Sequence, residues 1–186
     1  MFDAVIVAGA SSSRLGDIDK AMLEVGSSSL LARAVGAAAD ASTVVVVGPR
    51  RDLELDVVWC EEEPAGGGPV AAFAAGLART SAEVVLLLAA DLPFVAGAVT
   101  PLLASAARGD VAVLVDEAGR ANYLASAWQR SAAVRALGSA SSAGRSMRSL
   151  FDGLSVVQVS DAGGWGADCD TWDAVAAARA RADLDS

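Results

Sequence analysis

The sequence contains no histidine, and this absence excludes several kinds of chemistry. Without imidazole, the protein cannot carry a Ser-His-Asp or Cys-His catalytic arrangement, and it cannot bind a metal ion through histidine. Its two cysteines, Cys60 and Cys169, are far apart and form no CxxC pair, which argues against a zinc cluster and a disulfide scaffold. Any metal site should therefore use oxygen ligands. We expect two buried thiols in a reducing cytoplasm.

Positive charge is also scarce, since 14 Lys and Arg residues face 23 Asp and Glu residues, for a net charge of -9. This is the wrong sign for a protein that binds a phosphate backbone, so nucleic acid is not an expected partner. The apolar runs are shorter than the roughly 18 residues of a membrane helix. The first residues also lack the basic region of a signal peptide. These features predict a cytoplasmic protein without a membrane partner.

What is present is a chain of 186 residues, 54% of them hydrophobic, which fits one domain over residues 1–186. Short β-branched runs alternate with Ala- and Leu-rich stretches, a pattern typical of an α/β fold with a mainly parallel central sheet between two helical layers. The expected architecture is a single Rossmann-like three-layer domain. The expected strands are 4–8, 43–47, 57–60, 83–89, 111–115 and 155–159, and the expected helices are 29–39, 69–79, 98–108, 132–137, 145–151 and 171–182.

Irregular Gly- or Ser-rich segments follow the first and third expected strands, and ligands of open α/β sheets bind where such loops emerge. The first loop carries Arg14 and Lys20, and its backbone N–H groups could bind phosphate. Lys20 is the only lysine of the chain, and a compact ammonium suits phosphate oxygens. The alternative is a solvated loop with two surface bases. The loop matches neither GxGxxG nor GxxxxGK[ST], which disfavours a dinucleotide fold and a P-loop.

Carboxylates occur at two other points where chemistry is expected. Asp91 ends a buried apolar run, so it is either a solvated strand end or an oxygen ligand for Mg²⁺. Asp170 precedes the last helix, where it could cap that helix or supply a second metal carboxylate. A further segment of interest is 61–69, whose three glycines allow a ligand to approach the backbone before Pro69 starts a helix.

Four segments follow family patterns in the same order along the chain. Residues 7–23 follow L-A-G-G-x3-R-M-G-x2-D-K-x2-L. The segment D-x2-P-G-x-G-P-L-A-G is matched by Glu61, Pro64, Gly66 or Gly67, and Gly68-Pro69-Val70-Ala71. Residues 91–93 follow D-x-P, and residues 168–171 follow N/D-x-N/D-T. Together they resemble the molybdenum cofactor guanylyltransferases, MobA-like members of the GT-A-type nucleotidyltransferase superfamily. The departures are Ala10 and Ala72 in place of glycine, Glu61 in place of aspartate, and Asn122-Tyr123 where proline is common.

The resemblance implies that GMP is transferred from GTP to the terminal phosphate of a molybdopterin, with release of pyrophosphate. It implies Mg²⁺ as cofactor, held by Asp91 and Asp170, and a catalytic set of Arg14, Lys20 and Asp91. A phosphate monoester is largely dianionic at pH 7 and needs no histidine base, which agrees with the composition. The implied nucleotide-binding residues are Ala8, Gly9, Ala10, Lys20, Glu61, Gly68, Pro69 and Asp91.

Other activities fit the same residues. One alternative is a cytidylyltransferase of the same pathway or another small NTP transferase that acts on a phosphorylated metabolite. Ala10 and Ala72 could narrow the base pocket, so the nucleobase is the point on which these alternatives differ. The alternative outside enzymes is a nucleotide-binding regulatory module without turnover. A transferase of this kind would also make transient contact with proteins that deliver molybdopterin or accept the finished cofactor.

Overall fold

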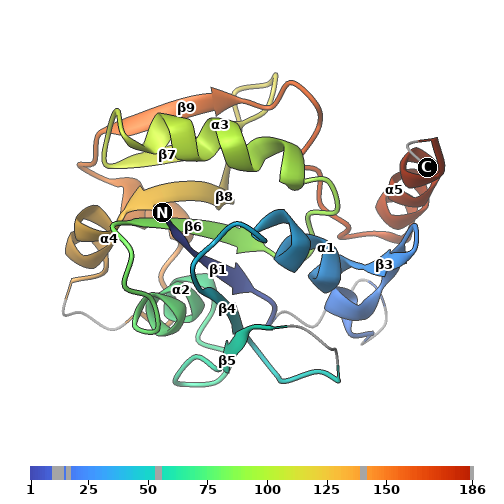
Figure 1. The fold of residues 1–186 in the computed structure, drawn as a ribbon, viewed down its shortest axis with the longest axis horizontal. Coiled ribbons are helices and arrows are strands. Elements are labelled where there is room, and N and C mark those ends of the chain that lie inside the picture. Colours follow the sequence, from blue (N-terminus) through green and yellow to red (C-terminus); the bar gives the residue numbers. More distant parts are fainter. Residues whose placement is uncertain (10–14, 16–17, 53–55, 139–141, 185–186) are drawn as a thin grey trace.

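The computed structural model describes residues 1–9, 15, 18–52, 56–138 and 142–184, and it contains a seven-stranded sheet between helices (Figure 1). The order of the strands in this sheet is β5-β4-β1-β6-β8-β7-β9. They are β1 (Asp3–Val7), β4 (Val44–Val47), β5 (Val58–Cys60), β6 (Val84–Ala89), β7 (Val111–Val115), β8 (Ala121–Gln129) and β9 (Val156–Ser160). The helices are η2 (Lys20–Met22), α1 (Leu30–Ala37), α2 (Pro69–Leu77), α3 (Ala96–Ala106), α4 (Arg130–Leu137), η3 (Met147–Phe151) and α5 (Trp172–Leu184).

The sheet is mainly parallel, as the sequence predicts. β1 pairs in parallel with β4 and β6, β4 pairs in parallel with β5, and β7 does so with β9. β8 is the exception, because it lies antiparallel between β6 and β7. The sequence did not predict β8, whose Ala, Ser, Asn and Gln residues give no β-branched run. The expected helix at 145–151 is instead the 3₁₀ helix η3.

Both faces of the sheet are covered, so the three-layer expectation is confirmed. Val5 and Leu87 point to the face on which α2, α4 and η3 pack, where Phe73 and Trp128 are fully buried. Leu86 and other side chains of the opposite face pack against α1 and α3 (Figure 1). None of the described helices is both long and apolar enough to cross a membrane. With both faces covered, polar groups of the strands can reach a ligand only at the strand ends.

The last helix belongs to a small separate cluster of side chains. α5 packs on a hairpin of β2 (Glu24–Val25) and β3 (Ser28–Ser29), beside the main sheet (Figure 1). The segment before α5 is tied to the sheet, because the Cys169 N–H donates to the carbonyl of Asp91 at 3.2 Å. This contact brings the segment 168–170 to the carboxyl end of β6.

The close packing of α2 on the sheet leads to a stability prediction. A Cβ added at Gly76 would lie 3.0 Å from Val47 Cγ2 and closer still to Val5 Cγ1. Gly76→Ala should therefore lower the free energy of unfolding by about 1–3 kcal/mol through overpacking. Gly36→Ala in α1 is the matched control, since nothing lies within 4 Å of its added Cβ. It should stabilise by about 0.5–1 kcal/mol. Chemical denaturation measures the free energy of unfolding of both variants. Equal changes in Gly76→Ala and Gly36→Ala would contradict the close packing of α2 on the sheet.

Candidate active site

A cavity of about 390 Å³ opens at the carboxyl ends of β1 and β6. It lies at the edge where the sequence predicts ligand binding, and the N-terminal residues of α2 form one wall. Its lining residues are Val7, Ala8, Gly9, Lys20, Ala21, Glu62, Gly66, Gly68, Pro69, Ala72, Ala89, Ala90, Asp91 and Leu124. Of the expected nucleotide-binding residues, six line it: Ala8, Gly9, Lys20, Gly68, Pro69 and Asp91. Ala10 and Arg14 lie outside the described residues.

Lys20 lies between two carboxylates at one end of this cavity. Its Nζ donates to Asp91 Oδ2 at 2.5 Å and to Asp170 Oδ1, and the Lys20 side chain is 6% exposed. Burial lowers the pKa of Lys20, but the charge of Asp91 and the hydrogen bonds to both carboxylates outweigh burial and raise it above its ordinary value. Lys20 therefore stays charged at neutral pH. A buried, paired ammonium rules out the interpretation of Lys20 as a solvated surface base.

The acidic groups around Lys20 fit a magnesium ion. Asp91 Oδ1 is buried and is the one such side-chain atom of the described residues without a hydrogen-bond partner. The described residues contain no cluster of three or more His, Cys, Asp and Glu side chains that could hold a metal. Mg²⁺ does not require one, since it commonly takes one or two carboxylates and completes its shell with water and phosphate oxygens. The donor set of Asp91 and Asp170 meets that demand.

Asp168 belongs to the same acidic group. Burial, followed by the charges of Asp170 and Asp91, raises the pKa of Asp168 above its usual value. Asp170 itself does not cap α5, because Thr171 Oγ1 accepts the hydrogen bond from the Ala174 N–H at 3.2 Å. The carboxylate of Asp170 is thus directed to Lys20 rather than to the helix end.

A different carboxylate, that of Glu62, lies on the wall near β1. Its Oε1 accepts from the Gly66 N–H at 3.1 Å and would lie 3.6 Å from a Cβ added at Gly9. Glu61, which the resemblance implied, is exposed and does not line the cavity. Neighbouring side chains of an extended chain point to opposite sides, and that alternation after β5 is the signal that could have identified Glu62.

The charged groups of the cavity come from different strands. Glu62 follows β5, but its carboxylate lies beside Gly9, which follows β1. Asp91 follows β6, the neighbour of β1 in the sheet. Gly68 precedes α2 with φ 87°, a backbone conformation that favours glycine, and Pro69 follows at the first position of the helix. The cavity thus offers a ligand one carboxylate beside the end of β1 and a cation with its carboxylate partners at the end of β6.

A second cavity, of about 740 Å³, adjoins the first and shares Pro69 and Leu124 with it. Its other lining residues are Leu114, Asp116, Arg120, Ala121, Asn122, Tyr123, Met147, Asp161, Gly164, Gly166, Ala167 and Asp168. Because β8 is antiparallel, it begins at the edge where β6 ends, so its first residues face this space. The two cavities therefore meet next to the acidic group around Lys20.

The pairing of β8 with β7 is irregular near the start of β8, and the Asn122 side chain makes two hydrogen bonds there. The register with β7 shifts between Val113 and Leu114, so that Leu114 pairs with Asn122. Asn122 Nδ2 donates to the carbonyl of Gly166 at 3.1 Å, and its Oδ1 accepts from the Leu124 N–H at 3.1 Å. The residue that departs from the family pattern thus ties β8 to the loop before α5.

The pairing of Lys20 leads to a prediction about stability. Lys20→Ala would leave Asp91 and Asp170 facing each other without a cation, which should lower the free energy of unfolding by about 1 kcal/mol. A fully buried pair would lose about 3–5 kcal/mol, but these side chains are 24% and 44% exposed and water screens them. Added Mg²⁺ should raise the melting temperature of Lys20→Ala more than that of the parent. In the double variant Lys20→Ala/Asp170→Asn, Mg²⁺ should raise the melting temperature no more than it does in the parent. An equal rise in the parent and in both variants would contradict the placement of Lys20 between the two carboxylates.

Comparison with known proteins supports the family resemblance that the sequence motifs indicate. The family model of the MobA-like NTP transferase domain matches residues 4–159. A protein of Trichormus variabilis described as a probable molybdenum cofactor guanylyltransferase is 40% identical over 95 residues, which are 48% of this chain and 45% of that protein. The chain spans about half the length of the curated relatives it matches.

Solved structures share the fold at low sequence identity. The molybdopterin-guanine dinucleotide biosynthesis protein A of Archaeoglobus fulgidus superposes with a TM-score of 0.77 at 17% identity, covering 98% of this chain and 99% of that one. A 2-C-methyl-D-erythritol 4-phosphate cytidylyltransferase of Thermus thermophilus does so with a TM-score of 0.73 at 22% identity, covering 96% and 98%. The sheet, the cavity at its carboxyl edge and the family match agree: the chain belongs to the MobA-like NTP transferase family.

Proposed function

We propose that the protein transfers GMP from GTP to the terminal phosphate of a molybdopterin-type acceptor and releases pyrophosphate. The observation that carries this proposal is the first cavity, which is lined by Glu62 beside the end of β1 and by Lys20 and Asp91 at the end of β6, with Asp170 bonded to Lys20. The Glu62 carboxylate matches the hydrogen-bond donors of a nucleobase, and the carboxylates around Lys20 would match the anionic phosphates once they hold Mg²⁺. The names of the curated relatives support the same reaction.

Glu62 supports guanine as the base. A guanine presents two adjacent donors, N1–H and the N2 amino group, and both can reach the oxygens of a single carboxylate. Cytosine presents one amino group on the corresponding edge. The Gly66 N–H occupies one site on Glu62 Oε1, and an ionised carboxylate has about four such sites. Two charge-assisted hydrogen bonds would therefore distinguish GTP from CTP.

At the other end, Lys20 would bind the triphosphate, and Asp91 and Asp170 would hold Mg²⁺. The ion would neutralise charge on the phosphates. The ammonium of Lys20 is preorganised by its two carboxylate partners, so it would need little reorganisation when negative charge develops on the transferred group. Arg14 is proposed to assist from the loop that precedes Lys20.

The second cavity is proposed to bind the acceptor. Its volume of about 740 Å³ suits a bicyclic or tricyclic molecule, and Tyr123 and Asn122 offer an aromatic face and polar groups. The two cavities adjoin at Pro69 and Leu124, and Asp168 of the second cavity interacts with the acidic group around Lys20, so an acceptor bound there would present its phosphate near the triphosphate. The reaction then depends on alignment of the two phosphates and on neutralisation of their charge rather than on a side-chain base.

The remaining parts of the proposal concern the whole protein. We take residues 1–186 as one nucleotidyltransferase domain, because Asp170, in the segment that leads into α5, accepts a hydrogen bond from Lys20 at the edge of the main sheet. Cys60 and Cys169 are free thiols, and burial raises the pKa of Cys169 to about 11, which fits a structural role in a reducing cytoplasm. Transient contact with proteins that supply molybdopterin or receive the product completes the proposal.

Nucleotide titration tests the assignment of the base. Calorimetry with Mg²⁺ should show GTP binding at least about tenfold tighter than CTP, ATP or UTP. Glu62→Gln should weaken GTP by about 10- to 100-fold, as expected for hydrogen bonds to a charged group, and should weaken CTP less. Glu61→Gln is the matched control from the neighbouring position. Equal binding of CTP and GTP by the parent would support the cytidylyltransferase alternative, and a larger effect of Glu61→Gln would return the role to that residue.

Kinetics of Asp91→Asn test the phosphate end. The variant should keep its fold, because Asp91 lies at a strand end with a partly exposed side chain, and it should lose about 10²–10³ in kcat. Asp40→Asn, an exposed change in the segment that enters β4 at the opposite edge of the sheet, should leave the rate unchanged. If Asp91→Asn retains a rate within a few-fold of the parent at equal Mg²⁺, the assignment of this site is wrong. GTP binding without any turnover by the parent would favour the regulatory module.

A further inference from the structure

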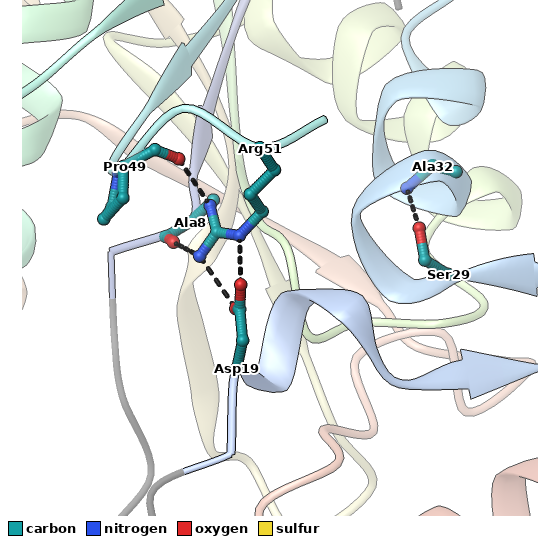
Figure 2. A network of polar contacts seen from close by, with 6 residues as sticks. All are labelled: Ala8, Asp19, Ser29, Ala32, Pro49 and Arg51. Carbon is teal, nitrogen blue, oxygen red and sulfur yellow. Dashed lines mark hydrogen bonds and ion pairs between the residues drawn. The ribbon is translucent and has the colours of Figure 1, made fainter. Parts of the chain in front are cut away.

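Arg51 lies in the segment after β4, and its guanidinium makes four hydrogen bonds (Figure 2). Nε and Nη2 donate to the two carboxylate oxygens of Asp19 at 2.7 and 2.9 Å. Nη2 also donates to the carbonyl of Ala8 at 2.8 Å, and Nη1 to the carbonyl of Pro49 at 3.0 Å. The Arg51 side chain is 9% exposed. A bidentate pair of this kind, with the arginine buried, is specific in geometry as well as charge.

These contacts join two points that are distant along the chain. Ala8 follows the last residue of β1, and Asp19 directly precedes Lys20. Asp19 is the residue before η2, a position where aspartate often caps a helix, yet its side chain makes no capping hydrogen bond there. The carboxylate of Asp19 is instead directed to Arg51. The position of Lys20 relative to β1 is thus fixed through its neighbour.

The side of the pair that carries Arg51 is held firmly to the sheet. The Ala8 N–H donates to the carbonyl of Val47 at 2.8 Å, which continues the pairing of β1 with β4. Gly48 follows with φ 144, and a Cβ there would lie 2.8 Å from the backbone of Ala8. Only glycine permits this close approach, which brings Arg51 within reach of Ala8. Arg51 therefore holds Asp19 in a fixed place relative to β1 and β4.

From this geometry we infer that Arg51 is a positioning residue for Lys20. It holds the residue before Lys20 against the end of β1, so that the ammonium stays between Asp91 and Asp170. Lysine cannot replace Arg51, because a single ammonium does not make the parallel pair of hydrogen bonds.

The first test observes Lys20 directly and needs no substrate. Lys20 is the only lysine of the chain, so protein labelled with ¹³C-lysine gives a single Cε signal in NMR spectra. In Arg51→Gln and in Asp19→Asn this signal should move toward that of free lysine and become narrower. Arg50→Gln, an exposed change at the neighbouring position, is the matched control and should leave the signal in place. An unchanged signal in both Arg51→Gln and Asp19→Asn would overturn the inference.

The second test is kinetic and rests on the proposed function, since it requires turnover with GTP. Displacement of a group that acts in the transition state should lower kcat by about 10- to 100-fold and change KM for GTP little. The effects of Arg51→Gln and Asp19→Asn should not add in the double variant, because the two residues act as one unit. Additive effects, or an unchanged kcat in variants whose Lys20 signal has moved, would overturn the positioning role.

The two tests also separate this inference from the proposed function. If the parent transfers no nucleotide, the proposed function fails, and the Lys20 signal still decides whether Arg51 positions Lys20. Asp19 is the more exposed residue of the pair, with a side chain that is 44% exposed. Asp19→Asn should therefore disturb the fold less than a substitution of Arg51. Thermal melting of each variant confirms that folded protein is compared.

Discussion

The ammonium of Lys20 lies between carboxylates that reach it from two parts of the fold. Asp91 comes from the end of β6, and Asp170 comes from the segment before α5. Burial alone would disfavour the charge on Lys20, and the two carboxylates alone would repel each other. Each group therefore offsets part of the electrostatic cost of the others. The cavity, the segment before α5 and the Arg51 pair all contribute to keeping these three side chains together.

The apolar strands explain why this group forms at an edge. Their side chains are buried on both faces by helices, so charged residues are excluded from the strand interiors. Polar side chains are concentrated in the loops at the carboxyl ends, where parallel strands bring them together. The reversed strand β8 changes this rule locally. It presents its beginning at the same edge, and this is why Asn122 and Tyr123 face the second cavity.

The parts that the sequence predicted are those with a local signal. β-branched runs identified β1, β4 and β6. The end of β6 located Asp91, and Lys20 was found as the only lysine of the chain, in the loop after β1. β8 was missed because its small and polar residues resemble a loop. Glu62 was missed by one position, because the match was anchored on Pro64, whereas counting back from Gly68 and Pro69 places the acidic position of the motif on Glu62. Arg51 carries no motif at all. Its role depends on the approach of β4 to β1, which only the three-dimensional structure reveals.

The packing of α5 has a consequence for motion. α5 and the β2–β3 hairpin form a small apolar cluster with Leu30 of α1, beside the large core of the sheet. Elements with few buried apolar contacts open more readily than the core of a domain. Asp170 belongs to the segment that leads into α5, whereas Asp91 belongs to the sheet. Local opening of α5 would therefore withdraw one negative charge from Lys20 and leave the other in place. Motion of this peripheral helix would then change the electrostatic field at the cavity.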